Sequence, residues 1–234
     1  MKKKFRHGNF ALKLDISKAF DTIKWNFIFD MLRRYGFSGN FIKFINTIFR
    51  SARLSVLING SPRGFFQCSR GVRQGDPLSG LLFALAEDYL SISLNDLVHA
   101  GIYSPIRAGK NLFTPSHLFY ADDILLFGQT TGKTISYIHR IFAHYEEVSG
   151  QVVCWKKSFV VFGDGVTTSK KNRVARTLGV KRGDLPFTYL GVRLFWGRVK
   201  DVNWQTSYLE LSVSWLHGRV KLCHKQEEST YLTR

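Results

Sequence analysis

The sequence predicts an α+β fold of the split βαβ type, in the order β-α-β-β-α-β. Three observations support this prediction. Short apolar runs that are typical of strands alternate with longer segments whose apolar residues recur at helical spacing. Residues that start and stop helices bound the longer segments. The chain of 234 residues, 44% hydrophobic with 20 Phe, is large enough for a sizeable core.

The first predicted strand covers residues 10–16, a short and mostly apolar run. Two amphipathic helices are predicted after it, one over residues 22–36 that ends at Gly36 and one over residues 40–49 that follows Ser38. The pattern then changes to strands, and Asn59-Gly60 between two strand-like runs predicts a β-hairpin.

A long helix is predicted from Asp76, its N-cap, through Pro77 at the first helical position to Gly101. Two strands joined by a tight turn at residues 121–123 follow it. The remaining predicted elements are a helix over 134–150, a strand over 151–163, a basic helix from about Ser169, a strand over 187–195 and an amphipathic segment over 203–222. The last dozen residues have no core pattern and are expected to fray.

Three acids that are distant in the sequence are predicted to meet in space. In a split βαβ unit the first two strands run parallel and the third lies antiparallel between them, so the end of strand one and the turn between strands two and three share one edge. Asp15 ends the first strand, and Asp122-Asp123 lie in that turn. Each feature alone also fits a simpler interpretation, a helix N-cap for Asp15 and an ordinary acidic turn for Asp122-Asp123.

Three crowded carboxylates raise one another's pKa and cost stability unless a divalent cation neutralises them. Oxygen ligands from Asp favour Mg²⁺ or Mn²⁺, and a pair of such ions serves phosphoryl or nucleotidyl transfer. The predicted site is therefore a two-metal site.

The charge balance favours a polyanionic partner. The chain has 34 Lys plus Arg against 17 Asp plus Glu, a formal net charge of +17 and a pI near 10.0. Any one basic cluster fits a solvated face, but the total indicates nucleic acid binding.

Composition also excludes several classes of protein. The three cysteines (Cys68, Cys154 and Cys223) are odd in number and form no C-x-x-C pair, so neither a disulfide partner nor a zinc site is predicted. No apolar run approaches the ~20 residues of a membrane span, and the N-terminal lysines precede no signal-type core. An intracellular protein of the nucleus or cytoplasm, without a membrane partner, is expected.

Five segments resemble, in the same order, motifs A to E of the reverse transcriptases of non-LTR (LINE-type) retrotransposons, particularly those of plants. They are "KLDISKAFD", "RQGDPLS", "FYADDILLF", "SGQVVCWKKS" and "LPFTYLGV". The resemblance implies an RNA-directed DNA polymerase with a polymerase palm, two Mg²⁺ (or Mn²⁺) ions, an RNA template, a DNA primer and deoxynucleoside triphosphates (dNTPs). Residues 1–165 would form the palm with motifs A to D. Residues 166–234 would hold motif E and a partial thumb.

The resemblance also implies roles for individual residues. The catalytic and metal-binding residues would be Asp15, Asp122 and Asp123. The nucleotide-binding residues would be Phe20, the aromatic gate that selects deoxynucleotides, and Arg73, Gln74 and Gly75 beside the nascent base pair. The primer contacts would be Tyr120, Tyr189, Leu190 and Gly191, and the candidate general acid toward pyrophosphate would be Lys157.

Simpler interpretations stay open for several of these residues: Phe20 also fits a core side chain, and Lys157 a solvated lysine. The chain departs from the family pattern at Gly80, Cys154 and Arg193, none of which is an implied metal ligand. A rival function is a basic remnant that binds nucleic acid without performing chemistry.

Only 14 residues precede Asp15, whereas the family places the fingers strands there, so the fingers are expected to be largely missing from this fragment. We expect these 234 residues alone to bind metal and nucleic acid but to show negligible primer extension. Positioning supplies ~7–11 kcal/mol of a barrier reduction, and losing one contact to transition-state charge costs ~10²-fold.

Primer extension on poly(rA)/oligo(dT) with Mg²⁺ or Mn²⁺ measures the polymerase activity of the 234 residues. The comparison includes the Asp122→Ala variant and a fusion with the upstream segment of an intact relative, which should restore activity. Robust extension by the 234 residues that depends on Asp122 would contradict the expectation.

Overall fold

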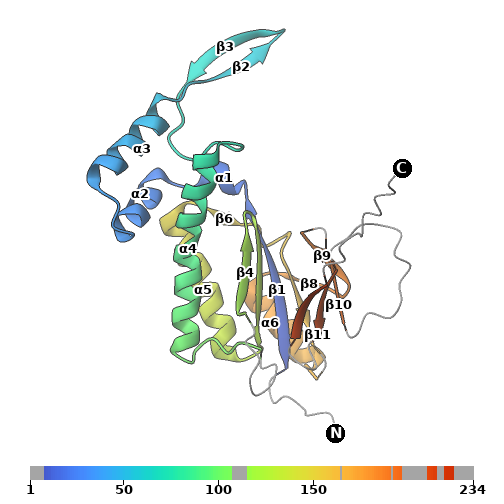
Figure 1. Ribbon diagram of the computed structural model, residues 1–234. Helices are drawn as coiled ribbons and strands as arrows, with labels where there is room; N and C mark the ends of the chain where they lie inside the picture. The colour runs from blue at the N-terminus through green and yellow to red at the C-terminus, as the bar shows by residue number, and fades with distance from the viewer. Residues whose placement is uncertain are drawn as a thin grey trace, which may run out of the picture.

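The computed structural model of the protein describes residues 8–106, 115–163, 165–190, 192–196, 210–214 and 219–223. Its centre is a sheet with the strand order β4-β5-β1-β7-β8, in which β6 also pairs with β1 (Figure 1). The strands are β1 (Asn9–Ser17), β4 (His117–Tyr120), β5 (Asp123–Gln129), β6 (Val152–Val153), β7 (Phe159–Phe162) and β8 (Lys181–Arg182). β5 is antiparallel to both β1 and β4 and lies between them, which confirms the predicted split βαβ order.

The two faces of the sheet carry different side chains because residues alternate along a strand. In β1, Phe10, Leu12 and Leu14 are fully buried in the main core on one face, and Lys13 and Asp15 lie on the other face. The helices α4 (Pro77–His99), α5 (Gly132–Ser149) and α6 (Thr168–Leu178) contribute to the main core, and so do the helices between β1 and α4. A smaller cluster on the second face joins β1 and β5 to β9 (Phe187–Tyr189) and β10 (Val192–Trp196).

The long helices start and stop close to the predicted residues, with α4 ending at His99 and α5 beginning at Gly132. The side chains of Ser38, Asp76 and Thr131 each accept a backbone N–H from the first turn of the helix that follows, which satisfies a donor without an intrahelical partner. Pro77 occupies the first turn of α4, and Gly150 closes α5 in the left-handed conformation at φ 76°. No helix in the described part of the chain combines the length and the apolar content needed to cross a bilayer.

Three helices and a hairpin lie between β1 and α4 in the chain. They are α1 (Ala19–Thr22), α2 (Trp25–Arg34), α3 (Gly39–Ser51) and the hairpin of β2 (Leu54–Ile58) and β3 (Ser61–Phe66). Asn59 and Gly60 both have positive φ, as the predicted two-residue turn requires. The hairpin extends away from the body of the molecule in Figure 1, and all of its residues are exposed on both faces.

Two predicted strands are each interrupted by a turn. Residues 151–163 form β6 and β7, which both pair antiparallel with β1. The turn between them is closed by the N–H groups of Lys157 and Ser158, which donate to the carbonyl of Cys154. Residues 187–195 form the antiparallel pair β9 and β10, with Leu190 at φ 50° between them.

The C-terminal part of the chain is described only in strands. Within the predicted segment 203–222, the structure has β11 (Glu210–Ser214) and part of β12 (Arg219–Cys223), which pair antiparallel. The expected frayed tail lies outside the described residues, and the division at residue 165 stays a prediction. Cys68 and Cys154 are free thiols.

Gly128 on β5 tests how rigidly the sheet packs. A Cβ there would lie 2.6 Å from the Tyr103 ring and 3.0 Å from the Phe10 ring. Both rings are fully buried, and the Tyr103 hydroxyl donates to two backbone carbonyls, so neither ring can move aside cheaply. We expect Gly128→Ala to lower the free energy of unfolding by ~1–3 kcal/mol in chemical denaturation.

Gly132→Ala is the matched control, because a Cβ at this first residue of α5 would have nothing within 4 Å. This control should be neutral or stabilising by ~0.5 kcal/mol. Equal stability of the Gly128→Ala variant and the wild type would contradict the described packing.

Candidate functional site

The pairing of β1 with β5 brings the predicted acids together. Asp15 stands directly opposite Asp123, and the N–H of Ile16 donates to the carbonyl of Asp122 at 2.9 Å. Side chains directly opposite on antiparallel strands share one face, with Cβ atoms ~5 Å apart. Asp15 lies within β1, and the N-cap position of α1 belongs to Lys18, so the helix N-cap interpretation of Asp15 is wrong.

The turn that carries the other two acids is tight and strained. Tyr120 pairs with Asp123, which leaves only Ala121 and Asp122 between the strands. Ala121 adopts φ 52°, a region that costs a residue with a Cβ ~1 kcal/mol or more. The turn leaves Asp122 exposed, whereas Asp123 is partly buried.

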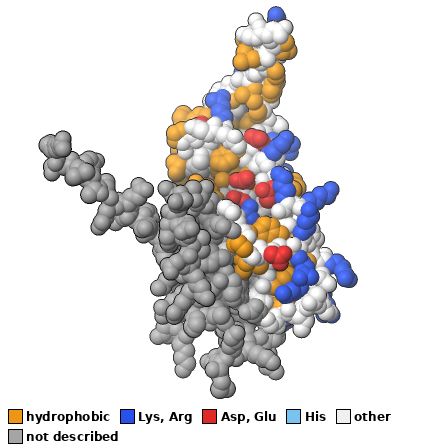
Figure 2. Space-filling view, turned by 90° about the vertical axis from the view of Figure 1, so that its right-hand side faces the viewer, with side chains coloured by type: hydrophobic (Ala, Val, Ile, Leu, Met, Phe, Trp, Pro, Cys, Tyr) orange, Lys and Arg blue, Asp and Glu red, His pale blue; other side chains and the backbone are white. Residues whose placement is uncertain are grey.

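Two lysines lie next to these carboxylates. The Nζ of Lys13 is 2.6 Å from Oδ1 of Asp123, and about a fifth of each side chain is exposed, at 19% and 23%. The Nζ of Lys157 is 3.9 Å from Oδ2 of Asp15, and Lys157 is 74% exposed, so this second pair is weak. On the face drawn in Figure 2, acidic side chains gather below the projecting hairpin, with Lys and Arg side chains beside them.

The loop between β6 and β7 is held against Asp15 by backbone hydrogen bonds. The N–H of Asp15 donates to Oγ of Ser158 at 3.2 Å, and its carbonyl accepts the N–H of Cys154 at 2.7 Å. These contacts explain why Lys157, which is distant in the sequence, lies beside the first acid. The structure therefore places the candidate general acid at the site.

The carboxylates suit a hard cation in chemical type but do not form a finished cage. Among the residues that the structure describes, no group of three or more His, Cys, Asp or Glu side chains is arranged to hold a metal ion. Asp15 and Asp123 share a face of the sheet, and Asp122 adjoins them at the exposed tip. Mg²⁺ binds to oxygen ligands and retains several waters, so partly exposed carboxylates are suitable ligands for it.

A fourth acid near the turn was missed by the sequence analysis. Glu87 on α4 is only 9% exposed, and burial together with the nearby Asp122 charge raises its pKa to about 8. The sequence signal was a charged residue within the apolar stretch of α4. Glu87 therefore carries a proton at neutral pH, which limits the negative charge beneath the turn.

The candidate nucleotide-binding residues lie beside α1. The Phe20 ring stacks on Phe83 with centroids 4.4 Å apart, and the Phe20 carbonyl accepts the N–H of Val72 at 2.7 Å. Phe20 is thus partly buried against the core and also adjoins the loop that carries the exposed residues Arg73, Gln74 and Gly75. Gly75 has φ 86°, and a Cβ there would meet nothing within 4 Å, so the space before it is open.

Hydrogen bonds of Gly71 with Ile23 and Trp25 form a hook that fixes this loop. The N–H of Gly71 donates to the carbonyl of Ile23 at 2.8 Å, and Nε1 of Trp25 donates to the carbonyl of Gly71 at 2.7 Å. A Cβ at Gly71 would lie 2.6 Å from the carbonyl oxygen of Asp21. Only glycine permits this close approach of the two segments, and these contacts join the loop before α4 to α1.

The candidate primer contacts differ in exposure. Tyr120 is 65% exposed beside the acidic turn, and Leu190 is 45% exposed. Tyr189 is buried and its hydroxyl donates to the carbonyl of Asp123 at 3.4 Å; burial and the Asp123 charge raise its pKa to about 12. Gly191 lies outside the described residues. The roles of all four in primer binding stay predictions.

Two further residues at the site were also missed. Lys13 could have been found, since it precedes Asp15 by two positions and the alternation of a strand puts both on one face. Ser158 had no recognisable signal, because its contact with Asp15 depends on a loop that the sequence did not predict.

Comparison with known proteins gives a consistent result. The family model described as "Reverse transcriptase (RNA-dependent DNA polymerase)" matches residues 2–194. The chain is 36% identical over 121 residues to the retrovirus-related Pol polyprotein of the type-2 retrotransposable element R2DM of Drosophila melanogaster. It is 35% identical over 120 residues to an uncharacterized 149 kDa protein of transposon TX1 from Xenopus laevis. These matches cover 52% and 50% of this chain but only 11% and 9% of the relatives.

Solved structures show a similar fold. Telomerase of Candida tropicalis in complex with the TWJ fragment of telomeric RNA superposes with a TM-score of 0.58 at 16% identity, covering 100% of this chain and 32% of that one. The apo telomerase of the same organism gives 0.58 at 14% identity over 94% of this chain and 34% of its own length. At these identities the likeness concerns the fold alone.

Protonated Glu87 makes stability depend on pH. Its pKa is about 8 in the folded chain against an ordinary value of 4.5. The raised pKa contributes to the free energy of unfolding. This contribution is fully present below pH ~4.5 and is lost as the pH rises through ~8, with a slope of at most ~1.4 kcal/mol per pH unit. The side chain in Glu87→Gln is always neutral, so we expect this variant to lose less stability as the pH rises. The measurement is the free energy of unfolding from chemical denaturation in metal-free buffer.

Glu147→Gln on α5 is the control, because the Glu147 side chain is 81% exposed. Its pH profile should follow that of the wild type. Parallel profiles for the wild type and Glu87→Gln would show that Glu87 is charged in the folded chain.

Proposed function

The chain belongs to the reverse transcriptase family, in the branch of the non-LTR retrotransposons, and we propose that it is the palm of an RNA-directed DNA polymerase. The proposed reaction adds a dNTP to the 3′-hydroxyl of a DNA primer paired to an RNA template. The observation that carries the proposal is the register of β1 on β5, which sets Asp15 opposite Asp123 and beside the turn that holds Asp122.

In this proposal the three aspartates hold two Mg²⁺ (or Mn²⁺) ions. Bound ions would supply Lewis acidity toward the primer hydroxyl and neutralise charge on the triphosphate. Asp15 and Asp123 already face the same side, and Asp122 is exposed next to them, so its side chain would turn toward the ions when they bind. Lys13 would give up its contact with Asp123, and its charge would remain available to a phosphate oxygen.

The chemistry exchanges one phosphate ester bond for another. The primer oxygen bonds to the α-phosphorus of the dNTP, the bond from that phosphorus to the bridging oxygen breaks, and pyrophosphate leaves. The hydroxyl proton passes to solvent, and we assign the proton received by pyrophosphate to Lys157. Support for this role is the position of Lys157 beside Asp15 and its high exposure, which leaves the ammonium accessible to a ligand.

The substrates follow from the surrounding residues. Phe20 would lie beneath the incoming sugar, with Arg73, Gln74 and Gly75 near the base pair that forms. Tyr120 and Leu190 would contact the primer, and buried Tyr189 would act by holding the turn through its bond to Asp123. The net charge of +17 suits two nucleic acid strands, and a telomerase of similar fold has been solved with an RNA fragment.

A second candidate function is nucleic acid binding without catalysis. The observation that favours it is the pairing of Asp123 with Lys13 and the nearness of Lys157 to Asp15, since protein cations can then stabilise the acids without metal. The two functions differ in whether the site collects divalent ions.

The variant Asp15→Asn separates them. If the acids hold metal, Mn²⁺ affinity measured by electron paramagnetic resonance should fall by ~10-fold or more, because one ligand shared by both ions loses its charge. Binding of labelled single-stranded RNA, measured by fluorescence anisotropy, should stay equal or tighten as repulsion of the phosphates falls.

Asp184→Asn, an exposed acid in the loop after β8, is the control and should leave Mn²⁺ binding unchanged. Equal Mn²⁺ affinities for the wild type and Asp15→Asn, with strand binding intact, would support the non-catalytic function instead.

A further inference from the structure

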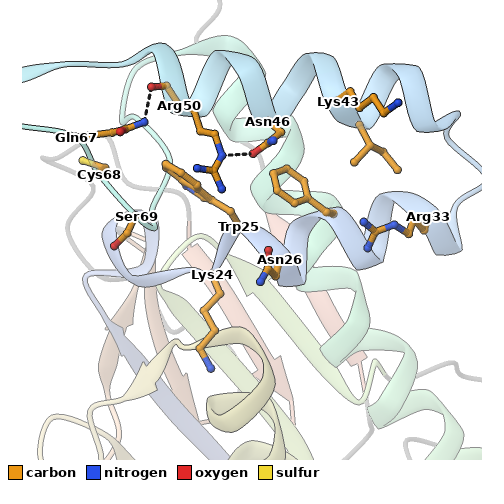
Figure 3. A pocket seen from close by; sticks show the side chains of 12 residues that line it. Lys24, Trp25, Asn26, Arg33, Lys43, Asn46, Arg50, Gln67, Cys68 and Ser69 are labelled. Atoms are coloured by element: carbon orange, nitrogen blue, oxygen red, sulfur yellow. Dashed lines mark hydrogen bonds between the residues drawn. The ribbon is translucent and has the colours of Figure 1, made fainter.

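A cavity of about 630 Å³ lies between α2, α3 and the residues that follow β3, apart from the acidic site (Figure 3). The lining contains no Asp or Glu. It contains four basic residues: Lys24, Arg33, Lys43 and Arg50. A concave surface lined by charges of one sign focuses the field and attracts a ligand of the opposite sign. The charge of the lining therefore favours an anionic ligand.

The four cations are not equally available. Lys24 donates to the carbonyl of Glu147 at 2.7 Å and points away from the cavity in Figure 3, and Arg33 pairs with Asp30. The Lys43 ammonium has no hydrogen bond or ion pair among the described residues, and both it and Arg50 are exposed. Lys43 and Arg50 are thus the two cations that can accept an anion without breaking an existing bond.

Arg50 is held in place for such a contact. Its Nε donates to Oδ1 of Asn46 at 3.0 Å, which leaves the two Nη groups for a ligand. In Figure 3 the guanidinium leans from α3 toward Trp25 on α2. Trp25 and Phe29 are each 8% exposed and form an apolar floor, and charge interactions above such a floor are screened less than in open water.

The spacing of the two cations favours a chain of phosphates over a single small anion. Lys43 and Arg50 are seven residues apart on α3, which is about 10 Å along a helix. In Figure 3 the Lys43 ammonium and the Arg50 guanidinium lie at opposite ends of the cavity, so successive phosphates of a strand can each contact one of them. The amide of Asn26, which also lines the cavity, adds a donor between the two helices.

The hook at Gly71 connects the cavity to the loop with Arg73, Gln74 and Gly75. Ser69, at one end of the cavity, precedes Gly71 by two residues, and Trp25 belongs both to the cavity and to the hook. The hook in turn adjoins the loop with Arg73, Gln74 and Gly75. A strand that occupied the cavity would therefore lie next to the segment proposed to contact the nascent base pair.

We propose that this cavity binds the phosphate backbone of a single-stranded nucleic acid, through Lys43 and Arg50, at a contact outside the acidic site. This inference rests on the proposed function, because the strand would be one that also reaches the acids. The contact is to phosphates, so it is independent of base sequence.

The test compares the double variant Lys43→Gln/Arg50→Gln with the control Lys133→Gln/Arg176→Gln, in which an exposed Lys and an exposed Arg are removed from α5 and α6. Fluorescence anisotropy with labelled single-stranded RNA and DNA is recorded between about 50 and 200 mM KCl. We expect the cavity variant to bind ~10-fold more weakly at the lower salt, and the slope of log affinity against log salt to fall by ~1.4, two phosphates at ~0.7 each. Circular dichroism confirms that both variants fold.

Mn²⁺ binding, measured on the same proteins, keeps this inference distinct from the proposed function. Equal losses of strand binding in the cavity variant and the control, with Mn²⁺ binding intact, would overturn the cavity contact and leave the proposed function standing. Loss of Mn²⁺ binding only in Asp15→Asn, together with loss of strand binding only in the cavity variant, would support both. If a dNTP binds to the wild type without a strand and the cavity variant no longer binds it, a nucleotide occupies the cavity. That result would overturn the proposed contact with a nucleic acid strand.

Discussion

The ladder between β1 and β5 is the constraint on which the site depends. Seven residue pairs, from Asn9 opposite Gln129 to Asp15 opposite Asp123, fix the register. The same register buries Phe10, Leu12 and Leu14 against the helices. A shift of one residue would turn Asp15 into the core, where an unpaired carboxylate costs several kcal/mol, and would expose the apolar side chains. The hydrophobic core therefore sets the position of the acids.

Much of the fold could be predicted because local signals and the global arrangement agree. Asn59-Gly60 specifies a turn wherever it occurs between strands, and Asp76 followed by Pro77 specifies a helix start. The meeting of Asp15 with the turn at Asp122 followed from strand order alone, since any split βαβ unit brings these two points to one edge.

The unpredicted features depend on tertiary contacts that leave little trace in the sequence. The break between β6 and β7 is made by N–H groups that bond to the carbonyl of Cys154, and no Gly, Pro or Asn marks it. The proton on Glu87 depends on burial by neighbours from several elements. The identity of the acids was readable and Lys157 was a candidate from the sequence, whereas the pairing of Lys13 with Asp123 and the contact of Ser158 with Asp15 became evident only from the distances.

The hairpin of β2 and β3 has a consequence for the dynamics of the chain. Its apolar residues are exposed on both faces, Leu57 and Phe65 at 71% each, so burial against the body contributes almost nothing to its stability. An isolated two-stranded ribbon is only marginally stable in water. Its backbone amides should therefore exchange hydrogen for deuterium with free energies near zero, while those of β1 exchange only when the whole domain unfolds. The hairpin that leads from the cavity on α3 to the loop before α4 is consequently a unit of local unfolding separate from the central sheet.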